Sequence, residues 1–380
     1  MRCLGLMSGT SADGVDAVLA DFRGSPTHPQ WELIRHVHSP YPEGLRHRVV
    51  SAGQGETGCA EQWLDLAEAI TEAQAKAARS CDPSGEAVLI GCHGQTVWHR
   101  PPTSRQRGAS WQLLQAPLLA QLLERPVVHD FRAADLALGG QGAPLVPRAD
   151  AALLGGTTGW RALLNLGGIA NLTLIPPCCG PERDAPVQGW DCGPANSLID
   201  LAVQQFSKGT LHFDRGGTMA KAGQSDETSI RRWLQEPYFQ SPPPKSTGRE
   251  LFGRANLQQR LNNLGQGCSN HDAVATLTSF SAAVVAQDLD QLMQRDQIRP
   301  LELIVAGGGR HNPVLMDQLQ RGCRGLDLGS SQEIGLPVEA REALVFALLA
   351  WWHQRNHPAN APSITGARRE AVLGVVVNPG

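Results

Sequence analysis

The feature that most constrains this chain is a pattern that occurs twice: an apolar run, a glycine-containing turn, and a second apolar run. Residues 4–7 lead through a turn at Gly9 into the alternating stretch 15–22. Residues 161–166 lead through a similar turn into residues 172–175. Short apolar runs around Gly-rich turns are typical of β-hairpins. We therefore predict two similar halves, whose facing hairpin turns would lie on opposite sides of a bound ligand.

Between and after the hairpins, strand-like and helical patterns alternate. Apolar residues recur at helical spacing over residues 61–79, and a buried strand is predicted at 87–91. Further helices are predicted at 112–125, 196–206, 272–298 and 339–355, and further strands at 126–128 and 301–306. This order predicts an α/β fold with mixed sheets and flanking helices. Because polar motifs repeatedly follow the strands, we expect them to line one ligand cleft.

A length of 380 residues suits two domains rather than one. The segment Gly139-Gly140-Gln141-Gly142-Ala143-Pro144 is a natural break, with glycines for hinge angles and a proline for stiffness. We predict a first lobe of residues 1–138 plus 345–380 and a second lobe of residues 139–344. Residues 176–190 are predicted to be a polar, proline-containing loop. Residues 237–250 contain three consecutive prolines and are predicted to lack regular structure.

Composition excludes several functional classes. The formal net charge of −3 gives no basic surface for nucleic acid. The nine cysteines include no CxxC pair, and a chain this long does not need a disulfide framework, so we predict reduced thiols and a cytoplasmic protein. The apolar run at the N-terminus is too short for a signal sequence, and no stretch approaches the roughly 20 apolar residues that span a bilayer.

Three glycine-containing loops are candidate nucleotide sites. Residues 9–14, Gly-Thr-Ser-Ala-Asp-Gly, offer backbone and hydroxyl donors to phosphate, and Asp13 is able to hold Mg²⁺ directly or through water. An ordinary hairpin turn explains the same residues about equally well. Residues 165–171 suit a second phosphate loop, with a tight turn as the alternative. Gly307, Gly308 and Gly309 would let an adenosine lie against the backbone, although a loop entering a helix is the simpler explanation.

Asp191 is the candidate general base. It lies between Trp190 and a Gly-Pro turn, and a carboxylate there could take a proton from water or a hydroxyl. The alternative is a helix N-cap, although Asn196 could fill that role instead. His93 and His129 each follow a strand and could contact a sugar hydroxyl or simply close a turn. Glu342 taken alone is best explained as a solvated helix face.

Taken together, these motifs resemble one family, the anhydro-N-acetylmuramic acid kinases, over nearly the whole chain. The matching strings, in order, are Gly5-Leu6-Met7-Ser8-Gly9-Thr10-Ser11 with Asp13-Gly14-Val15-Asp16, His93-Gly94-Gln95-Thr96, His129-Asp130-Phe131-Arg132, residues 139–147, Asn165 to Leu172, Asp191-Cys192-Gly193-Pro194, Pro242-Pro243-Pro244-Lys245-Ser246-Thr247-Gly248-Arg249-Glu250, Gly307-Gly308-Gly309 and Glu342-Ala343. The chain departs from the family pattern at Ala12, Cys192, Ala195 and Val338, where side chains other than the common ones stand.

The resemblance implies a two-domain, actin-like (ribonuclease H-like) ATPase fold with ATP and Mg²⁺ in the interdomain cleft. It implies that water opens 1,6-anhydro-N-acetylmuramic acid and that the freed 6-oxygen takes the γ-phosphoryl group, giving N-acetylmuramic acid 6-phosphate for cell-wall recycling. It also implies a small-molecule substrate, and a homodimer is one expected state because related enzymes are often dimers. The charge and the apolar runs described above predict no nucleic-acid or membrane partner. Two alternatives stay open: a kinase of the same fold for another hydroxyl compound, and a non-catalytic ATP-binding scaffold.

Each site residue then has a predicted role. The base is Asp191, and the Mg²⁺ carboxylate is Asp13. The predicted ATP-binding residues are Gly9, Thr10, Ser11, Ala12, Asp13, Gly14, Val15, Asp16, Asn165, Gly167, Gly168, Gly307, Gly308 and Gly309. The predicted substrate-binding residues are His93, Gln95, Arg132, Asn171 and Glu342.

Overall fold

The computed structural model describes the chain except for residues 10, 11, 104, 244, 249, 250, 266, 331 and 334, and residue 338 is described by its backbone alone. The contacts divide it into two compact units. We call Met1–Gly155 with Glu339–Gly380 the N-terminal unit, and Gly156–Val338 the central unit. The sequence predicted these boundaries at 138/139 and 344/345. In the structure, residues 139–155 and 339–344 lie in the N-terminal unit rather than in the central unit.

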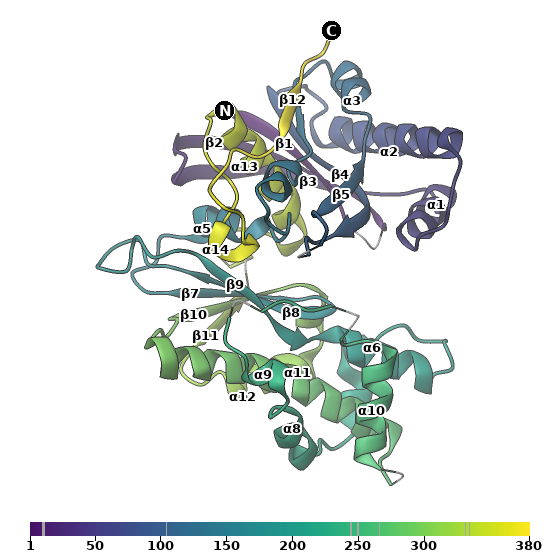
Figure 1. Ribbon diagram of the computed structural model, residues 1–380, viewed down its shortest axis with the longest axis vertical. Helices are drawn as coiled ribbons and strands as arrows, with labels where there is room; N and C mark the ends of the chain where they lie inside the picture. The colour runs from purple at the N-terminus through teal and green to yellow at the C-terminus, as the bar shows by residue number, and fades with distance from the viewer. Residues whose placement is uncertain are drawn as a thin grey trace. The chain divides into compact units, whose positions relative to one another are not determined.

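The N-terminal unit is built on one mixed sheet with the strand order β12-β6-β4-β1-β2-β3, and β5 pairs with β4 (Figure 1). β1, β2 and β3 form an antiparallel meander, while β4 runs parallel to β1, and β6 runs parallel to β4. The strands are β1 (Arg2–Ser8), β2 (Gly14–Ser25), β3 (His28–Pro40), β4 (Leu89–Arg100), β5 (Ala109–Leu113), β6 (Val127–His129) and β12 (Val375–Val377). The helices are α1 (Glu43–Gly53), α2 (Ala60–Cys81), α3 (Ala116–Leu123), α4 (Ala133–Ala137), α5 (Val146–Leu154), α13 (Arg341–Gln354) and α14 (Pro362–Thr365).

The central unit repeats this plan. Its sheet has the order β11-β10-β7-β8-β9, with β7, β8 and β9 antiparallel and β10 and β11 parallel to β7. The strands are β7 (Arg161–Leu166), β8 (Ile169–Ile175), β9 (Gln188–Pro194), β10 (Glu302–Ala306) and β11 (Asp327–Ser330). The helices are α6 (Asn196–Phe206), η1 (Arg215–Gly217), α7 (Thr218–Ala222), α8 (Glu227–Trp233), α9 (Pro237–Gln240), α10 (Arg254–Leu264), α11 (Asn270–Asp296), η2 (Gly308–His311) and α12 (Pro313–Gly322), and η3 (Val338–Ala340) leads back to the first unit. The two hairpins predicted from the sequence thus begin equivalent sheets, and the predicted α/β class is confirmed.

Helix α13 explains why the end of the chain belongs to the N-terminal unit. Its residues from Ala343 to Trp352 are all buried, so it is apolar on every side, as expected for a helix inside a core. It lies directly on the sheet, because a Cβ at Gly5 of β1 would overlap the carbonyl oxygen of Ala343. A Cβ at Gly91 of β4 would likewise overlap the carbonyl oxygen of Phe346.

Two buried carboxylates hold the loop that the sequence predicted as a hinge. Asp150 on α5 forms a bidentate ion pair with Arg341 at the start of α13. Asp135 accepts hydrogen bonds from the Gly142 amide (2.8 Å), the Asn360 side chain (2.9 Å) and the Thr365 hydroxyl (2.7 Å). These contacts tie residues 139–155 to elements of the N-terminal unit, which accounts for the shifted boundary.

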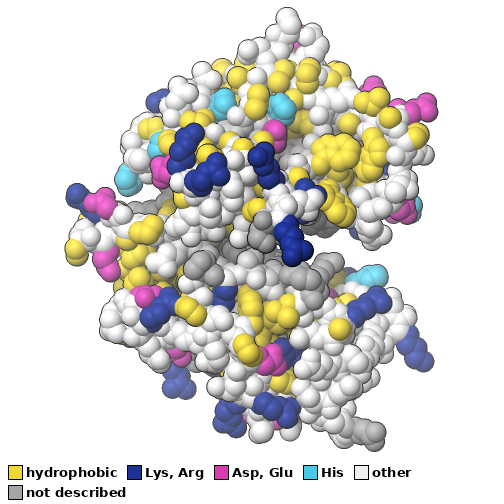
Figure 2. Space-filling model, viewed as in Figure 1, with side chains coloured by type: hydrophobic (Ala, Val, Ile, Leu, Met, Phe, Trp, Pro, Cys, Tyr) yellow, Lys and Arg dark blue, Asp and Glu magenta, His cyan; other side chains and the backbone are white. Residues whose placement is uncertain are grey.

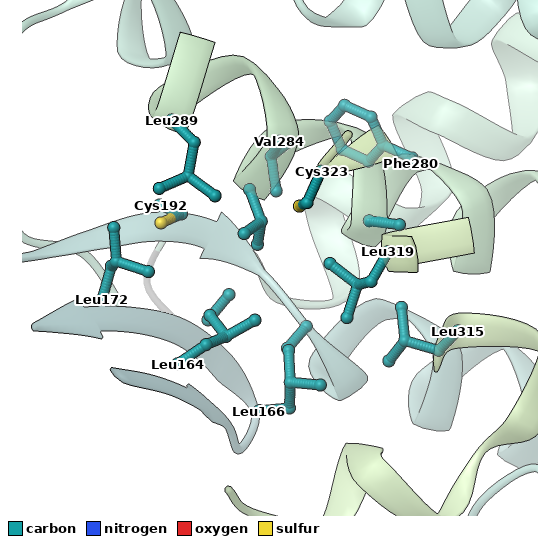
Figure 3. Close-up of a cluster of buried hydrophobic side chains, with 14 of the residues drawn as sticks. Leu164, Leu166, Leu172, Cys192, Phe280, Val284, Leu289, Leu315, Leu319 and Cys323 are labelled. Carbon is teal, nitrogen blue, oxygen red and sulfur yellow. The ribbon is translucent and has the colours of Figure 1, made fainter. Parts of the chain in front are cut away.

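The core of the central unit lies between its sheet and helices α11 and α12. Figure 3 shows side chains from both sides meeting there, and the labelled residues are Leu164, Leu166, Leu172, Cys192, Phe280, Val284, Leu289, Leu315, Leu319 and Cys323. All of them are buried. This packing fixes the side of the sheet that faces the helices.

On the face in Figure 2, acidic and basic side chains lie interspersed among hydrophobic and uncharged polar groups. Of the helices that the structure describes, none combines the length and apolar character needed to cross a membrane.

Three local sequence predictions were wrong. β4 runs on to Arg100, so the motif at His93 lies inside a strand rather than after one, because β5 pairs with the second half of β4. Residues 188–190 were predicted to be loop, yet they begin β9, which pairs with β8. Residues 237–240 form helix α9 within the segment predicted to lack regular structure, with Pro237 in the first helical turn, where its missing N–H costs nothing.

Candidate active site

The turn between β1 and β2 is held by a buried glutamine. Gln95 donates from Nε2 to the Gly9 carbonyl (3.0 Å) and accepts at Oε1 from the Ser8 hydroxyl (2.6 Å). Ala12 is buried with φ +51 and donates its amide to the Gly9 carbonyl (3.2 Å). Gln95, predicted to bind sugar, is therefore occupied at both ends of its amide in shaping the predicted phosphate loop. Thr10 and Ser11 lie outside the described residues.

His93 and Arg132, both predicted to bind the sugar, contact each other. Arg132 donates from Nη2 to His93 Nε2 (3.0 Å) and from Nη1 to the Gly142 carbonyl (2.8 Å). Since a guanidinium only donates, His93 Nε2 accepts, and the ring proton lies on Nδ1, which donates to the Gly94 carbonyl (2.9 Å). Burial and the Arg132 charge lower the pKa of His93 to about 3, so the ring is neutral. His93 thus orients Arg132.

The Glu342 carboxyl lies close enough to Asp16 and Arg132 for both charges to affect its pKa. Although the Glu342 side chain reaches solvent, the protein around it raises the pKa of its carboxyl, while the adjacent Arg341 guanidinium lowers it. Asp150, Asp16 and Arg132 also act on this carboxyl, the first two raising its pKa and the last lowering it. Four predicted residues, His93, Arg132, Asp16 and Glu342, therefore form one polar group on the N-terminal unit. Asp16 itself accepts from His36 (3.0 Å) and His38 (3.1 Å), which the sequence did not indicate, and Asp13 is exposed beside the turn.

In the central unit, two of the predicted glycine loops line one pocket of ≈ 620 Å³. Its walls come from the β7–β8 turn, the first turns of α6 and the start of η2. The lining residues are Leu166, Gly167, Gly168, Asn196, Ser197, Asp200, Leu201, Gln204, Gly253, Arg254 and Gly308. Ser197 and Arg254 were not predicted, and neither stands in a motif that would have indicated them.

The glycines around this pocket differ in what they contact. A Cβ at Gly307 would come 2.6 Å from Asn165 Oδ1, and one at Gly309 would come 2.7 Å from Leu166 Cβ, so these two pack against the end of β7. A Cβ at Gly168 would meet nothing closer than 3.8 Å, and one at Gly308 would meet nothing within 4 Å. The fold therefore leaves no room for a side chain at Gly307 and Gly309. At Gly168 and Gly308 a methyl group would fit in the protein as it stands.

Asp191 lies on β9, and its carboxylate is held by three donors. Asn171 Nδ2 donates to Oδ1 (2.7 Å), while the Ser246 hydroxyl and the Thr247 amide donate to Oδ2 (both 2.9 Å). Asn171 is its neighbour on β8. Ser246 and Thr247 belong to the proline-containing segment, whose position over β9 the spacing of 55 residues does not reveal. Asn171, predicted to bind sugar, donates to the predicted base and orients its carboxylate.

Asn196 does not cap α6 with its side chain. Its Nδ2 donates to the carbonyls of Leu166 (3.0 Å) and Gly167 (2.8 Å), so it fixes the shape of the β7–β8 turn. The N-cap position of α6 is Ala195. Asp191 is not a cap either, because it lies within the strand.

A duplicated sheet of three antiparallel and two parallel strands, with a glycine-lined pocket beside the first hairpin of the second copy, is the fold of the actin-like ATPase class. The family model for anhydro-N-acetylmuramic acid kinase matches residues 1–379. This chain belongs to the anhydro-N-acetylmuramic acid kinase family.

Similar sequences align with this chain over their full length. The anhydro-N-acetylmuramic acid kinase of Synechococcus sp. (strain CC9902) is 89% identical over 380 residues, covering 100% of both chains. That of Parasynechococcus marenigrum (strain WH8102) is 69% identical over 379 residues, again covering 100% of both. The solved structure of the (R)-2-hydroxyglutaryl-CoA dehydratase component A of Acidaminococcus fermentans aligns with 92% of this chain and 98% of its own, at 11% identity and a TM-score of 0.42. The family assignment depends on the family model and the sequence relatives, and not on this solved structure.

Proposed function

We propose that this chain is an ATP-dependent kinase that opens 1,6-anhydro-N-acetylmuramic acid with water and phosphorylates it to N-acetylmuramic acid 6-phosphate, acting in the cytoplasm during cell-wall recycling. Family membership supports the kinase activity. The observation that carries the hydrolytic half is the Asp191 carboxylate, oriented from two segments by Asn171, Ser246 and Thr247. A carboxylate accepts about four hydrogen bonds, which exceeds these three donors and leaves capacity for a water molecule.

In this mechanism Asp191 takes a proton from water while the water oxygen bonds to the anomeric carbon. The bond from that carbon to the bridging oxygen breaks, and the bridging oxygen leaves with the electron pair. It then attacks the γ-phosphorus of ATP, and ADP departs. General-base help of this kind contributes roughly 10²–10⁴ in rate. On the N-terminal unit, we assign Arg132 and Glu342 to the sugar, with His93 orienting Arg132.

The nucleotide would be held mainly by backbone. We assign the pocket at Gly168 and Gly308 to the adenosine part, because a flat group can approach a chain without side chains. The β1–β2 turn would supply amide donors to phosphate oxygens. Mg²⁺ usually binds one or two carboxylates together with substrate phosphates and water, and the exposed Asp13 carboxylate fits that role. When bound, the ion would neutralise charge on the phosphates.

The test combines a variant with an isotope. The protein, ATP, Mg²⁺ and the anhydro sugar are incubated in ¹⁸O-labelled water, and the product is analysed by mass spectrometry. We expect a phosphorylated product that carries ¹⁸O at the anomeric oxygen. Asp191→Asn should lower kcat by roughly 10²–10⁴ with the ATP dissociation constant within about twofold. Asp290→Asn, which changes an exposed carboxylate on α11, is the control and should leave kcat unchanged.

Two outcomes would contradict the proposal. Phosphorylated product without label would mean that this is a kinase for a free hydroxyl, and normal turnover in Asp191→Asn would remove Asp191 from the mechanism.

A further inference from the structure

A buried carboxylate lies behind the predicted base and is not used in the mechanism above. Asp288 is on α11, and its side chain is 3% exposed. Its Oδ1 accepts from Lys245 Nζ (2.8 Å), and its Oδ2 accepts from Trp190 Nε1 (2.9 Å). Cys192 on the same face is buried close enough to affect the pKa of the Asp288 carboxyl. Asp288 is thus hydrogen-bonded to the residue before Asp191 and to the segment that covers Asp191.

The alternation of β9 explains this arrangement. Side chains along a strand point alternately to opposite faces, so Trp190 and Cys192 face the helices while Asp191 faces the other side. Trp190 and Cys192 are both buried in the core of the central unit. Asp288 therefore holds the strand from the face opposite to the base.

Lys245 links the same carboxylate to the donors of Asp191. It immediately precedes Ser246 and Thr247, and its own carbonyl accepts from the Asp191 amide (3.0 Å). Its ammonium also lies 5.3 Å from the centre of the Tyr238 ring, and the Tyr238 hydroxyl donates to the Asp191 carbonyl (2.7 Å). Displacing the Lys245 side chain would move the two groups that bond Asp191 Oδ2.

We propose that Asp288 and Lys245 are positioning residues, which form a buried ion pair that fixes the Asp191 carboxylate between β9 and the segment containing Ser246 and Thr247. This inference rests on the proposed role of Asp191. A buried ion pair brings little net stability compared with apolar residues of the same volume, so stability alone does not account for one at this place. Orientation does, because a displacement of about 1 Å at a reacting group is able to cost about 100-fold in rate.

The experiment separates positioning from folding. Lys245→Met and Asp288→Asn are each made singly, and the double variant Lys245→Met/Asp288→Leu restores an uncharged, packed interior. Kinetics, ATP binding and thermal unfolding are measured for all three. Glu302→Gln is the control, because Glu302 pairs with Arg161 in the same unit (2.8 Å) at the beginnings of β10 and β7, away from Asp191.

We expect the single variants to lower kcat roughly 10- to 100-fold while KM and the dissociation constant for ATP stay within about twofold. The double variant should recover the unfolding temperature but not kcat. Glu302→Gln should keep wild-type kcat. If the double variant recovers kcat together with stability, or if the single variants keep wild-type kcat, the positioning role is refuted. Failure of the proposed function would look different, since the wild-type protein itself would then give no ¹⁸O-labelled product.

Discussion

The pocket of the central unit gives a direct test of nucleotide binding. Of its neighbouring glycines, Gly309 lacks room for a side chain in the fold itself, whereas Gly308 has such room unless a ligand is bound. Gly308→Ala adds a single methyl group beside the pocket, where nothing lies within 4 Å of the new Cβ. Gly309→Ala adds the same group next door, where it would come 2.7 Å from Leu166 Cβ and 3.1 Å from Asn196 Nδ2.

The expected magnitudes follow from these surroundings. Forcing a methyl group into a filled space typically costs about 1–3 kcal/mol. In Gly309→Ala that cost falls on folding. In Gly308→Ala the folded protein has room, and replacing glycine should stabilise it by about 0.4–1 kcal/mol through the unfolded chain. The cost then falls on the bound nucleotide, and about 1–3 kcal/mol corresponds to a rise of about 5- to 150-fold in the ATP dissociation constant.

The assay is ATP titration by calorimetry together with thermal unfolding of the unliganded protein. Gly308→Ala should unfold at or slightly above the wild-type temperature and bind ATP more weakly. Gly309→Ala should unfold at a lower temperature. Wild-type ATP affinity in a well-folded Gly308→Ala protein would refute our assignment of the adenosine site.

Two further predictions concern the N-terminal unit. Because burial holds the pKa of His93 near 3 in the folded protein against about 6.5 when unfolded, the unfolded state binds the extra proton between these values, so stability should fall by about 1.4 kcal/mol per unit as pH falls through this window. Denaturant unfolding at pH 6 and pH 4 should show this loss of stability in the wild-type protein, and His93→Gln should lack the part that His93 contributes. If wild type and His93→Gln lose the same stability between pH 6 and pH 4, His93 is charged when folded. Gly5→Ala should destabilise the unit by about 3 kcal/mol, because its Cβ overlaps the Ala343 carbonyl. The control Gly44→Ala lies in α1 with open space around it and should be neutral or stabilising, and equal effects of the two would contradict the close packing of α13.

The hairpins could be predicted from the sequence because their signals are local. Apolar alternation and a glycine turn are enough to indicate β1 with β2 and β7 with β8. Strand β9 was missed because Gly189, Gly193 and Pro194 read as turn residues, whereas pairing with β8 and core packing by Trp190 outweigh their low strand propensity. Its extent depends on a partner strand, which no local pattern shows.

In the site, residues could be predicted from their chemical type, but the contacts that orient them could not. Asp191 and the glycines could be selected because few residue types perform those tasks. Gln95 and Asn171 were predicted to contact sugar through the family resemblance, and in the structure their amides hold the Gly9 turn and Asp191. The bonds from Ser246 and Asp288 depend on segments that meet only after folding, and so could not be predicted from spacing.

The position of α13 has a consequence for synthesis on the ribosome. The sheet surface around Gly5 and Gly91 emerges early, but the helix that covers it lies beyond residue 340. The central unit is one continuous stretch, Gly156–Val338, and is complete before that helix appears. Domains generally fold as units during synthesis. The central unit is therefore able to complete its core before the N-terminal unit, although its synthesis begins later. Until α13 has been synthesised, the N-terminal unit carries uncovered apolar surface that chaperones could bind.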